Sequence, residues 1–392
     1  MFKRSLTPHI KSLAKKYPVV TLYGPRQSGK TTLIKQTFPD KPYVNLEDPD
    51  SRFLATEDPT GFMASYPDGV ILDEIQRVPK LLSYIQVTVD EKDQKGMYIL
   101  TGSHQAKLHE AVSQSLAGRT TVLRLLPLSL SEMRSSDIND PIDDIILKGG
   151  YPKIYRDNLP IANAYSSYFQ TYVERDVRQL LQIKNILHFE RFVKLIASRI
   201  GQIINYSSLA SDVGVSANTI KEWVAVLEAT YILVRLEPYF ENFGKRLIKS
   251  PKIYFTDTGL ACHILGIESV NQLKNDPIYG NLFENLIVLE LMKARFNQAL
   301  DPNLYFYRDV TGREVDLISR QGSFLVPIEI KSNHSFNASF LKGLNDFHNQ
   351  AAKRAKGGAL VYMGKNTQKV GPYSLYTPES CSNIVNQISE KG

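Results

Sequence analysis

The sequence predicts an α/β protein that begins with a largely parallel sheet covered by helices on both faces. Short apolar runs alternate with helical patterns between residues 17 and 134, which is typical of βαβ units. The runs are residues 19–23, 43–46, 69–73, 97–101 and 120–125. A glycine-rich turn follows the first run, and an acidic pair ends the third. Together these features predict a phosphate-binding site at one edge of the sheet.

The composition is that of a folded globular protein long enough for two or three domains. Of the 392 residues, 43% are hydrophobic and 22% are charged. The net charge of +7 favours an anionic partner such as nucleic acid, although a slightly basic solvated surface explains it equally well. The two cysteines, Cys262 and Cys381, exclude a disulfide framework and a cysteine-based zinc site.

The chain carries no sign of membrane insertion. No apolar run approaches the ~20 residues that a membrane span needs. Residues 2–16 alternate charged and apolar side chains without a signal-peptide core, so we expect a short amphipathic helix before the first strand. We therefore expect a soluble, cytoplasmic protein that does not enter a membrane.

Beyond the first sheet the pattern changes twice, which predicts domains at residues 1–134, 145–262 and 263–392 with a polar linker at 135–144. Residues 162–198 have a helical period. Residues 207–227 predict a helix-turn-helix, and two short strands at 233–236 and 252–255 predict a wing with its turn at 242–244. A helix after Gly280 and a hairpin of strands 315–319 and 324–330 follow.

The turn after the first strand fits the pattern G-x-x-x-x-G-K-[ST]. Its glycines let backbone N–H groups surround phosphates, its lysine reaches β- and γ-phosphate oxygens, and its final hydroxyl is a Mg²⁺ ligand. An apolar strand precedes the turn and a helix follows it, as this chemistry requires. We predict that ATP is bound with Mg²⁺ by Gly24, Pro25, Arg26, Gln27, Ser28, Gly29, Lys30, Thr31 and Thr32.

Acidic and polar residues on later strands predict the rest of an ATP-hydrolysing site. Asp73 ends a buried strand and is expected to hold Mg²⁺, and Glu74 is expected to deprotonate the attacking water. Thr101 or Ser103, at the end of the next strand, would sense the γ-phosphate, or simply belong to a hydroxyl-rich turn. Arg119 would neutralise transition-state charge in its own subunit or a neighbour's, or be an ordinary surface arginine. Lys30, Ser103 and Arg119 therefore join Glu74 as predicted catalytic residues.

A second acidic set occurs near the C-terminus. Glu329 and Lys331 point to the same face of a strand because side chains alternate, and a hairpin would bring Asp316 beside them. Glu284 on the preceding helix is a fourth candidate. Two carboxylates and a lysine suit metal-assisted phosphodiester cleavage, although such a fold can keep its acids without cutting.

The chain resembles the small prokaryotic AAA-superfamily ATPases that carry a C-terminal domain of unknown function. The motifs that carry the resemblance are residues 24–31, 72–76, 100–103, 116–119, 172–176, 254–260 and 280–285. The resemblance implies a P-loop NTPase core, a helical and winged-helix middle region and an α/β restriction-endonuclease-like C-terminal domain. The D…E-x-K order of Asp316, Glu329 and Lys331 is similar to that superfamily, with Val315 where a proline often stands.

Two functions follow from these patterns. The first is an Mg-dependent ATPase coupled to DNA or another nucleic acid through its C-terminal half. The second is an ATP-dependent switch that holds a protein or DNA partner and has an inactive nuclease-like domain. Residues 201–262 contain six Lys or Arg and six Asp or Glu, and this neutral balance is poor for binding phosphates. A protein-contact role for the winged helix is therefore equally open, as is a ring-like oligomer.

Overall fold

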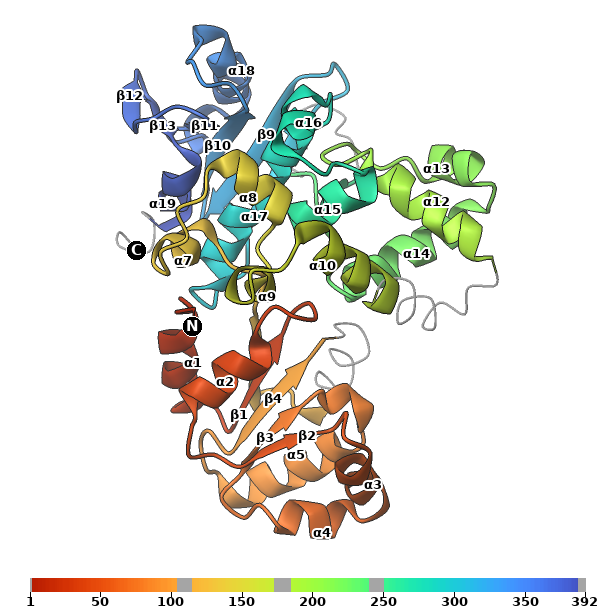
Figure 1. The fold of residues 1–392 in the computed structure, drawn as a ribbon. Helices are drawn as coiled ribbons and strands as arrows, with labels where there is room; N and C mark the ends of the chain where they lie inside the picture. The colour runs from red at the N-terminus through yellow and green to blue at the C-terminus, as the bar shows by residue number, and fades with distance from the viewer. Residues whose placement is uncertain (1, 104–114, 173–184, 240–249, 387–392) are drawn as a thin grey trace. The chain divides into compact units, whose positions relative to one another are not determined.

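The computed structural model describes residues 2–103, 115–172, 185–239 and 250–386. The chain divides into two compact units. Unit 1 comprises residues 1–128, 229–231 and 296–300, and unit 2 comprises residues 129–228, 232–295 and 301–392. Figure 1 labels most of the helices and many of the strands of both units.

Unit 1 is built on a parallel five-stranded sheet with the order β2-β3-β4-β1-β5 (Figure 1). All five predicted strands are present. They are β1 (Val19–Tyr23), β2 (Tyr43–Asn45), β3 (Val70–Asp73), β4 (Tyr98–Gly102) and β5 (Thr120–Arg124). Because β4 lies between β1 and β3, Thr101 near its end and Ser103 just after it are placed between the phosphate-binding turn and the acidic pair.

Helices bury both faces of this sheet. They are α1 (Thr7–Ala14), α2 (Lys30–Thr37), α3 (Pro49–Glu57), α4 (Pro59–Ala64), the 3-10 helix η1 (Ile75–Arg77) and α5 (Leu81–Lys92). The amphipathic α1 expected from residues 2–16 packs with α2 on one face, where Ile10 and Ile34 join Ile71 and Ile99 in a single core. Leu100 faces the other side by strand alternation and is also fully buried.

The first part of unit 2 is mainly helical. Its elements are α7 (Leu130–Arg134), α8 (Ile142–Lys148), α9 (Pro152–Arg156), α10 (Ile161–Tyr168), α12 (Ile186–Ala197), α13 (Tyr206–Val213), α14 (Ala217–Ala229), β6 (Leu233–Leu236), β7 (Lys252–Phe255), α15 (Thr258–Leu265) and α16 (Val270–Asn275). The predicted linker at 135–144 was wrong at its end, because α8 begins at Ile142. Pro141 precedes this helix and two aspartates lie in its first turn, which favours a helix start.

The predicted helix pair and strand pair are both present in this region. The helix α13 ends at Gly214, which adopts a left-handed conformation with φ of 87°. The hydroxyl of Ser216 then accepts a hydrogen bond of 3.1 Å from the amide of Thr219 in α14. The strands β6 and β7 pair antiparallel. The turn predicted at 242–244 and the nearby cations Lys245, Arg246 and Lys249 lie outside the described residues.

The last part of unit 2 is a six-stranded mixed sheet with the order β12-β13-β11-β10-β9-β8. The long helix α17 (Tyr279–Phe296) precedes it. The strands are β8 (Leu304–Arg308), β9 (Glu314–Gln321), β10 (Phe324–Lys331), β11 (Ala359–Tyr362), β12 (Gln368–Val370) and β13 (Tyr373–Tyr376), with η3 (Ala338–Leu341), α18 (Lys342–Ala351), η4 (Ala352–Arg354), η5 (Pro378–Ser380) and α19 (Asn383–Asn386) between and after them. The antiparallel pairing of β9 with β10 confirms the predicted hairpin.

Candidate active site

The glycine-rich turn connects β1 directly to α2 and requires glycine at two positions. A Cβ atom on Gly24 would lie 2.0 Å from the carbonyl oxygen of Leu125, so no side chain fits there. Gly29 precedes α2 with φ of 91°, a conformation that side chains disfavour. Gln27 also has a positive φ, of 62°. This backbone places the first amides of α2 at the end of the sheet, where a helix N-terminus attracts phosphate.

Lys30 is the first residue of α2, and its ammonium group lies inside the turn. Its Nζ atom donates hydrogen bonds of 2.9 Å to the carbonyl oxygens of Gly24 and Pro25. Burial lowers the pKa of Lys30, and the charges of Glu74 and Asp73 oppose that effect. A cation is thus held among backbone dipoles at the place where the sequence predicts phosphates.

Arg4 supports the turn from outside, and sequence reasoning missed it. Its guanidinium group is buried and donates hydrogen bonds of 2.8 Å to the carbonyl oxygen of Ser28 and 2.7 Å to that of Leu126. The Oγ atom of Ser28 is itself buried and has no partner among the described residues. No sequence signal distinguished Arg4 from the other charged residues of the N-terminal segment.

Asp73 ends β3 and is surrounded by hydroxyl donors. Its Oδ2 atom accepts hydrogen bonds of 2.7 Å from Thr31 and 2.8 Å from the hydroxyl of Tyr43, and its Oδ1 atom accepts one from Thr101. Burial and the adjacent Asp73 raise the pKa of the Tyr43 hydroxyl, which therefore stays a donor. The hydroxyl and carboxylate oxygens of Thr31 and Asp73 are the ligands that Mg²⁺ prefers, so the pair fits that ion.

Glu74 follows β3 in a left-handed conformation with φ of 57°, which turns it away from the strand direction. Its Oε2 atom accepts a hydrogen bond of 2.9 Å from the hydroxyl of Ser103 and another from the side-chain amide of Gln76. Thr101 contacts the backbone amide of Glu74 at 3.4 Å. The structure therefore brings Glu74 and the predicted Ser103 together, while Gln76 was not predicted to take part.

The remaining residues of the turn lie at its exposed side. Arg26 contacts Glu47 at 3.2 Å, and Arg77 contacts the same carboxylate at 3.2 Å. Thr32 is exposed on the first turn of α2. These side chains flank the phosphate-binding turn, and their contact with a nucleotide stays a prediction.

Arg119 is not brought to this site. It lies just before β5, beside the start of β1, and its guanidinium forms a two-pronged ion pair with Asp90 at 2.6 and 2.7 Å. The phosphate-binding turn is at the other end of β1, five residues away along the strand, or roughly 15 Å. A role for Arg119 within its own subunit is therefore not supported by this arrangement, whereas a role in a neighbouring subunit stays a prediction.

The four predicted C-terminal residues do gather in unit 2. Lys331 contacts Glu329 at 2.6 Å and Asp316 at 3.7 Å, and Asp316 accepts a hydrogen bond of 2.8 Å from the amide of Ile330. Burial, followed by the charge of Asp316, raises the pKa of Glu329 to about 8. Burial likewise raises the pKa of Glu284. The charge of Lys252 opposes this rise, and the charge of Asp316 adds to it. The hairpin and α17 thus converge as the strand alternation predicted.

Three residues that were not predicted also belong to this acidic cluster. Lys252 of β7 contacts Glu284 at 3.0 Å and Glu314 at 2.7 Å. The hydroxyl of Tyr254 donates a hydrogen bond of 2.6 Å to Glu284. Within the described parts of the chain, no group of three or more His, Cys, Asp or Glu side chains is arranged to hold a metal ion. The cluster does not fit the Mg²⁺ that the nuclease resemblance implies.

Exposed basic residues of the described middle region include Arg191 and Lys194 on α12 and Lys221 on α14, whereas others are paired with acids. Arg235 forms an ion pair of 2.7 Å with Glu228. Trp223 is buried against Phe189 and Phe192 and is a core residue rather than a platform for bases. The helix pair α13–α14 has the expected form, but its role in binding nucleic acid stays a prediction.

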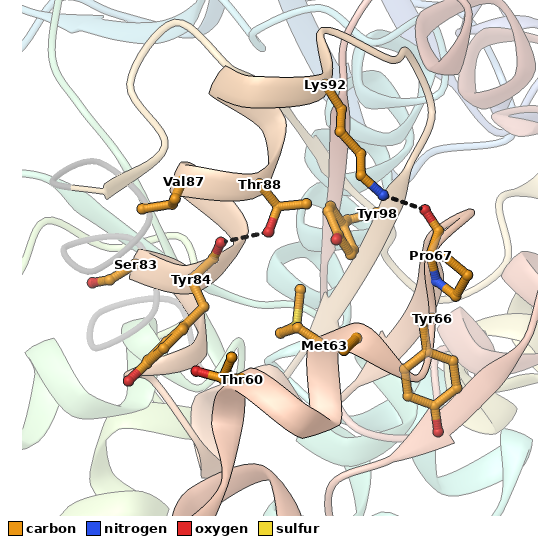
Figure 2. A pocket seen from close by; sticks show the side chains of 11 residues that line it. Thr60, Met63, Tyr66, Pro67, Ser83, Tyr84, Val87, Thr88, Lys92 and Tyr98 are labelled. Carbon is orange, nitrogen blue, oxygen red and sulfur yellow. Dashed lines mark hydrogen bonds between the residues drawn. The ribbon is translucent and has the colours of Figure 1, made fainter.

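A separate cavity of about 650 Å³ lies on unit 1 (Figure 2). Residues of α4 and α5 line it, among them Met63 and Val87, and Lys92 closes one side by donating a hydrogen bond of 2.8 Å to the carbonyl of Pro67. Tyr98, which also lines it, begins β4, whereas the phosphate-binding turn lies where the strands end. The cavity is therefore distinct from the nucleotide site.

Three family models match this chain. Residues 16–134 match an AAA domain, residues 139–271 match a domain of unknown function (DUF8612), and residues 279–379 match another (DUF4143). None of the helices in the described part of the chain combines the length and apolar character that crossing a bilayer requires.

The sequence relatives are uncharacterized proteins. The chain is 31% identical over 372 residues to the uncharacterized protein Rv2008c of Mycobacterium tuberculosis, which covers 93% of this chain and 80% of that protein. It is 23% identical over 341 residues to the uncharacterized protein MJ1637 of Methanocaldococcus jannaschii, with 70% and 68% covered.

Two solved structures are similar to parts of the chain. A Walker-type ATPase of Pyrococcus abyssi has 15% sequence identity and a TM-score of 0.45, with 67% of this chain and 96% of that chain covered. AMPPCP-bound DnaA from Aquifex aeolicus has 13% identity and a TM-score of 0.29, with 57% and 85% covered.

Proposed function

Because this chain belongs to the family of prokaryotic AAA-domain P-loop ATPases that carry a C-terminal DUF4143 domain, we propose that it hydrolyses ATP to ADP and phosphate in a magnesium-dependent reaction. The observation that carries the proposal is the convergence of Lys30, Thr31, Asp73 and Glu74 at one edge of the unit 1 sheet. Thr31 and Asp73 are joined by a hydrogen bond of 2.7 Å, although they are 42 residues apart in sequence.

Each residue has a distinct role in this proposal. The amides of the turn and the Lys30 ammonium neutralise the β- and γ-phosphates. Thr31 and Asp73 hold Mg²⁺, which lowers the charge on the phosphates when it is bound. Glu74, fixed by Ser103 and Gln76, orients the attacking water and takes its proton.

The test is phosphate release by the purified full chain. We expect turnover with ATP and Mg²⁺ that is lost in EDTA and in Lys30→Ala. Binding of a fluorescent ATP analogue, measured on the same samples, separates lost binding from lost chemistry. Wild-type turnover no faster than that of Lys30→Ala would remove the proposal.

We further propose that ATP turnover is coupled to DNA or another nucleic acid through unit 2. The support is the α13–α14 helix pair, with Ser216 capping α14. Addition of DNA at low salt should raise the turnover, and the effect should weaken as salt is raised because phosphate contacts are screened. Equal turnover with and without DNA at every salt concentration argues instead for a protein partner.

The second candidate function is an ATP-dependent switch without nuclease activity. Its specific support is that Glu284 and Glu314 are already paired with Lys252 inside unit 2. The switch predicts no cleavage of DNA in Mg²⁺ and ATP. Cleavage by wild type that disappears in Asp316→Ala would exclude it.

A further inference from the structure

The acidic cluster of unit 2 contains its own cations. The cluster consists of Glu284, Glu314, Asp316 and Glu329 with Lys252 and Lys331, and Arg308 contacts Glu314 at its edge at 3.2 Å. Acidic groups brought together in a largely buried site repel one another unless positive charge or a bound proton lies among them. Both lysines make close contacts with these acids, so the chain supplies that charge itself.

Lys252 is the more deeply buried of the two lysines. Its side chain is 4% exposed, whereas that of Lys331 is 32% exposed. The Nζ atom of Lys252 lies within hydrogen-bonding distance of carboxylates on two different elements, Glu284 on α17 and Glu314 on β9. This ammonium therefore bridges two acids, as a bound metal ion would.

The helix α17 is fixed to the strand that carries Lys252. Asn285 donates a hydrogen bond of 2.9 Å to the carbonyl of Phe255 and accepts one of 2.8 Å from its amide. Asn281 donates a hydrogen bond of 2.7 Å to the carbonyl of Ile200, just before the bridge to β7. Residues 281, 284 and 285 share one face of the helix. The hydrogen bonds of Asn281 and Asn285 therefore hold Glu284 next to β7, in addition to its ion pair with Lys252.

The acids that Lys252 does not reach are also partly occupied. Asp316 accepts the amide of Ile330, and the Oε1 atom of Glu329 accepts from Lys331. The Oε2 atom of Glu329 is buried without a hydrogen-bond partner among the described residues. A buried oxygen of the Glu329 carboxyl thus remains without a partner beside a site that lysines already fill.

We propose that Lys252 is the resident cation of this cluster and closes it to divalent metal ions. The ammonium group takes the bridging position between Glu284 and Glu314, and the cluster gains a divalent-cation site when that charge is removed. This inference concerns unit 2 alone and does not depend on ATP hydrolysis by unit 1.

The experiment compares Mn²⁺ binding by the nucleotide-free full chain in wild type, Lys252→Met and Lys148→Met. Electron paramagnetic resonance counts bound Mn²⁺, and ions bound by unit 1 contribute equally to all three proteins. Lys148 is the matched control, because it forms an ion pair of 2.7 Å with Asp140 in the same unit but is 32% exposed. We expect Lys252→Met to bind one additional Mn²⁺, with an affinity at least tenfold higher than that of wild type for any ion at the same cluster. Lys148→Met should match wild type.

Thermal unfolding gives an independent readout. Trp223 is the single tryptophan and is buried in unit 2, so its fluorescence follows that unit. We expect Lys252→Met to melt on the order of 5 °C below wild type, because Glu284 loses its counter-ion, and Mn²⁺ to restore the loss. The double variant Lys252→Met with Glu284→Gln should recover stability without Mn²⁺ and should not respond to it.

Two results would overturn the proposal. One is wild type binding Mn²⁺ in unit 2 as tightly as Lys252→Met, and the other is Lys252→Met gaining neither Mn²⁺ binding nor stabilisation. If Lys252→Met is unfolded without metal, native Trp223 fluorescence that returns on addition of Mn²⁺ supports the proposal. Its failure to return, while the double variant folds, refutes it.

Discussion

Replacing Glu74 with glutamine keeps the size of the side chain but removes the group that takes a proton from water. In the structure Glu74 is held by Ser103 at 2.9 Å and by Gln76, while its backbone amide contacts Thr101. A positioned general base contributes about 10²- to 10⁴-fold to a rate, so we expect the turnover of Glu74→Gln to fall by that factor. The affinity for ATP should persist, because Lys30 and the turn are untouched.

Ser103→Ala should have a smaller effect on the same reaction. It removes one hydrogen bond to a carboxylate, which is worth about 1.5 to 3 kcal/mol and corresponds to roughly 10- to 150-fold in rate. Gln76 continues to hold Glu74, so we expect a value near the lower end. Ser65→Ala is the matched control, because Ser65 is an exposed serine of unit 1 that bonds only its own helix, at 3.0 Å.

The assay is phosphate release under saturating ATP, with binding of a fluorescent ATP analogue measured in parallel. The reasoning predicts an order, in which Glu74→Gln is slowest, Ser103→Ala intermediate and Ser65→Ala like wild type. Turnover of Glu74→Gln within threefold of wild type would show that Glu74 is not the base. Ser103→Ala slower than Glu74→Gln would show that the hydroxyl does more than position the carboxylate.

Three further predictions concern stability. Arg4→Ala removes buried hydrogen bonds to two backbone carbonyls at and beside the phosphate-binding turn. Calorimetry should show unit 1 unfolding at a temperature several degrees lower, and ATP binding should weaken. An unchanged melting temperature would contradict this. Asp257→Ala leaves the backbone amides of Gly150 and Leu260 without their buried acceptor, and the Tyr165 hydroxyl keeps only the carbonyl of Lys148. The unfolding free energy of unit 2 should fall by about 3 kcal/mol, measured by urea titration of the tryptophan signal, and a loss under 1 kcal/mol would count against this. The pKa of Glu329 is raised to about 8 from an ordinary 4.5, so the folded chain keeps a proton that the unfolded chain releases. The unfolding free energy should therefore fall as pH rises from about 5 to 8, by at most about 1.4 kcal/mol per pH unit. Glu329→Gln should flatten that fall, and an identical pH profile in both proteins would refute the assignment.

The sequence predicted the parallel sheet and the phosphate-binding turn well, because both depend on local patterns. Five apolar runs became five strands, and the spacing of glycines around Lys30 fixed the turn. Asp73 and Glu74 were identifiable because they follow a buried strand directly. Period and residue type sufficed for these features.

Other parts of the site depend on contacts between distant residues and had no local signal. Arg4 bonds the carbonyl of Ser28 in the turn across 24 residues and that of Leu126, after β5, across 122. Tyr43 and Gln76 read as ordinary strand and helix residues until the fold brings them to Asp73 and Glu74. Residue type and motif could not decide where Arg119 lies. It stands before β5, bound to Asp90 and away from the phosphate-binding turn of its own chain, so only its role in a neighbouring subunit stays a prediction.

The hydrogen bonds between α17 and β7 bear on how this protein can be divided into fragments. A cut at residue 263, where the sequence predicted the last domain to begin, leaves Asn281, Glu284 and Asn285 on one side and their partners on the other. In a fragment starting there, three polar side chains on one helix face would lack their hydrogen-bond partners, and the fragment would be prone to misfold or aggregate. Expression of the C-terminal part in a native form therefore requires Ile200 as well as β6 and β7, in the same polypeptide or supplied as a second chain.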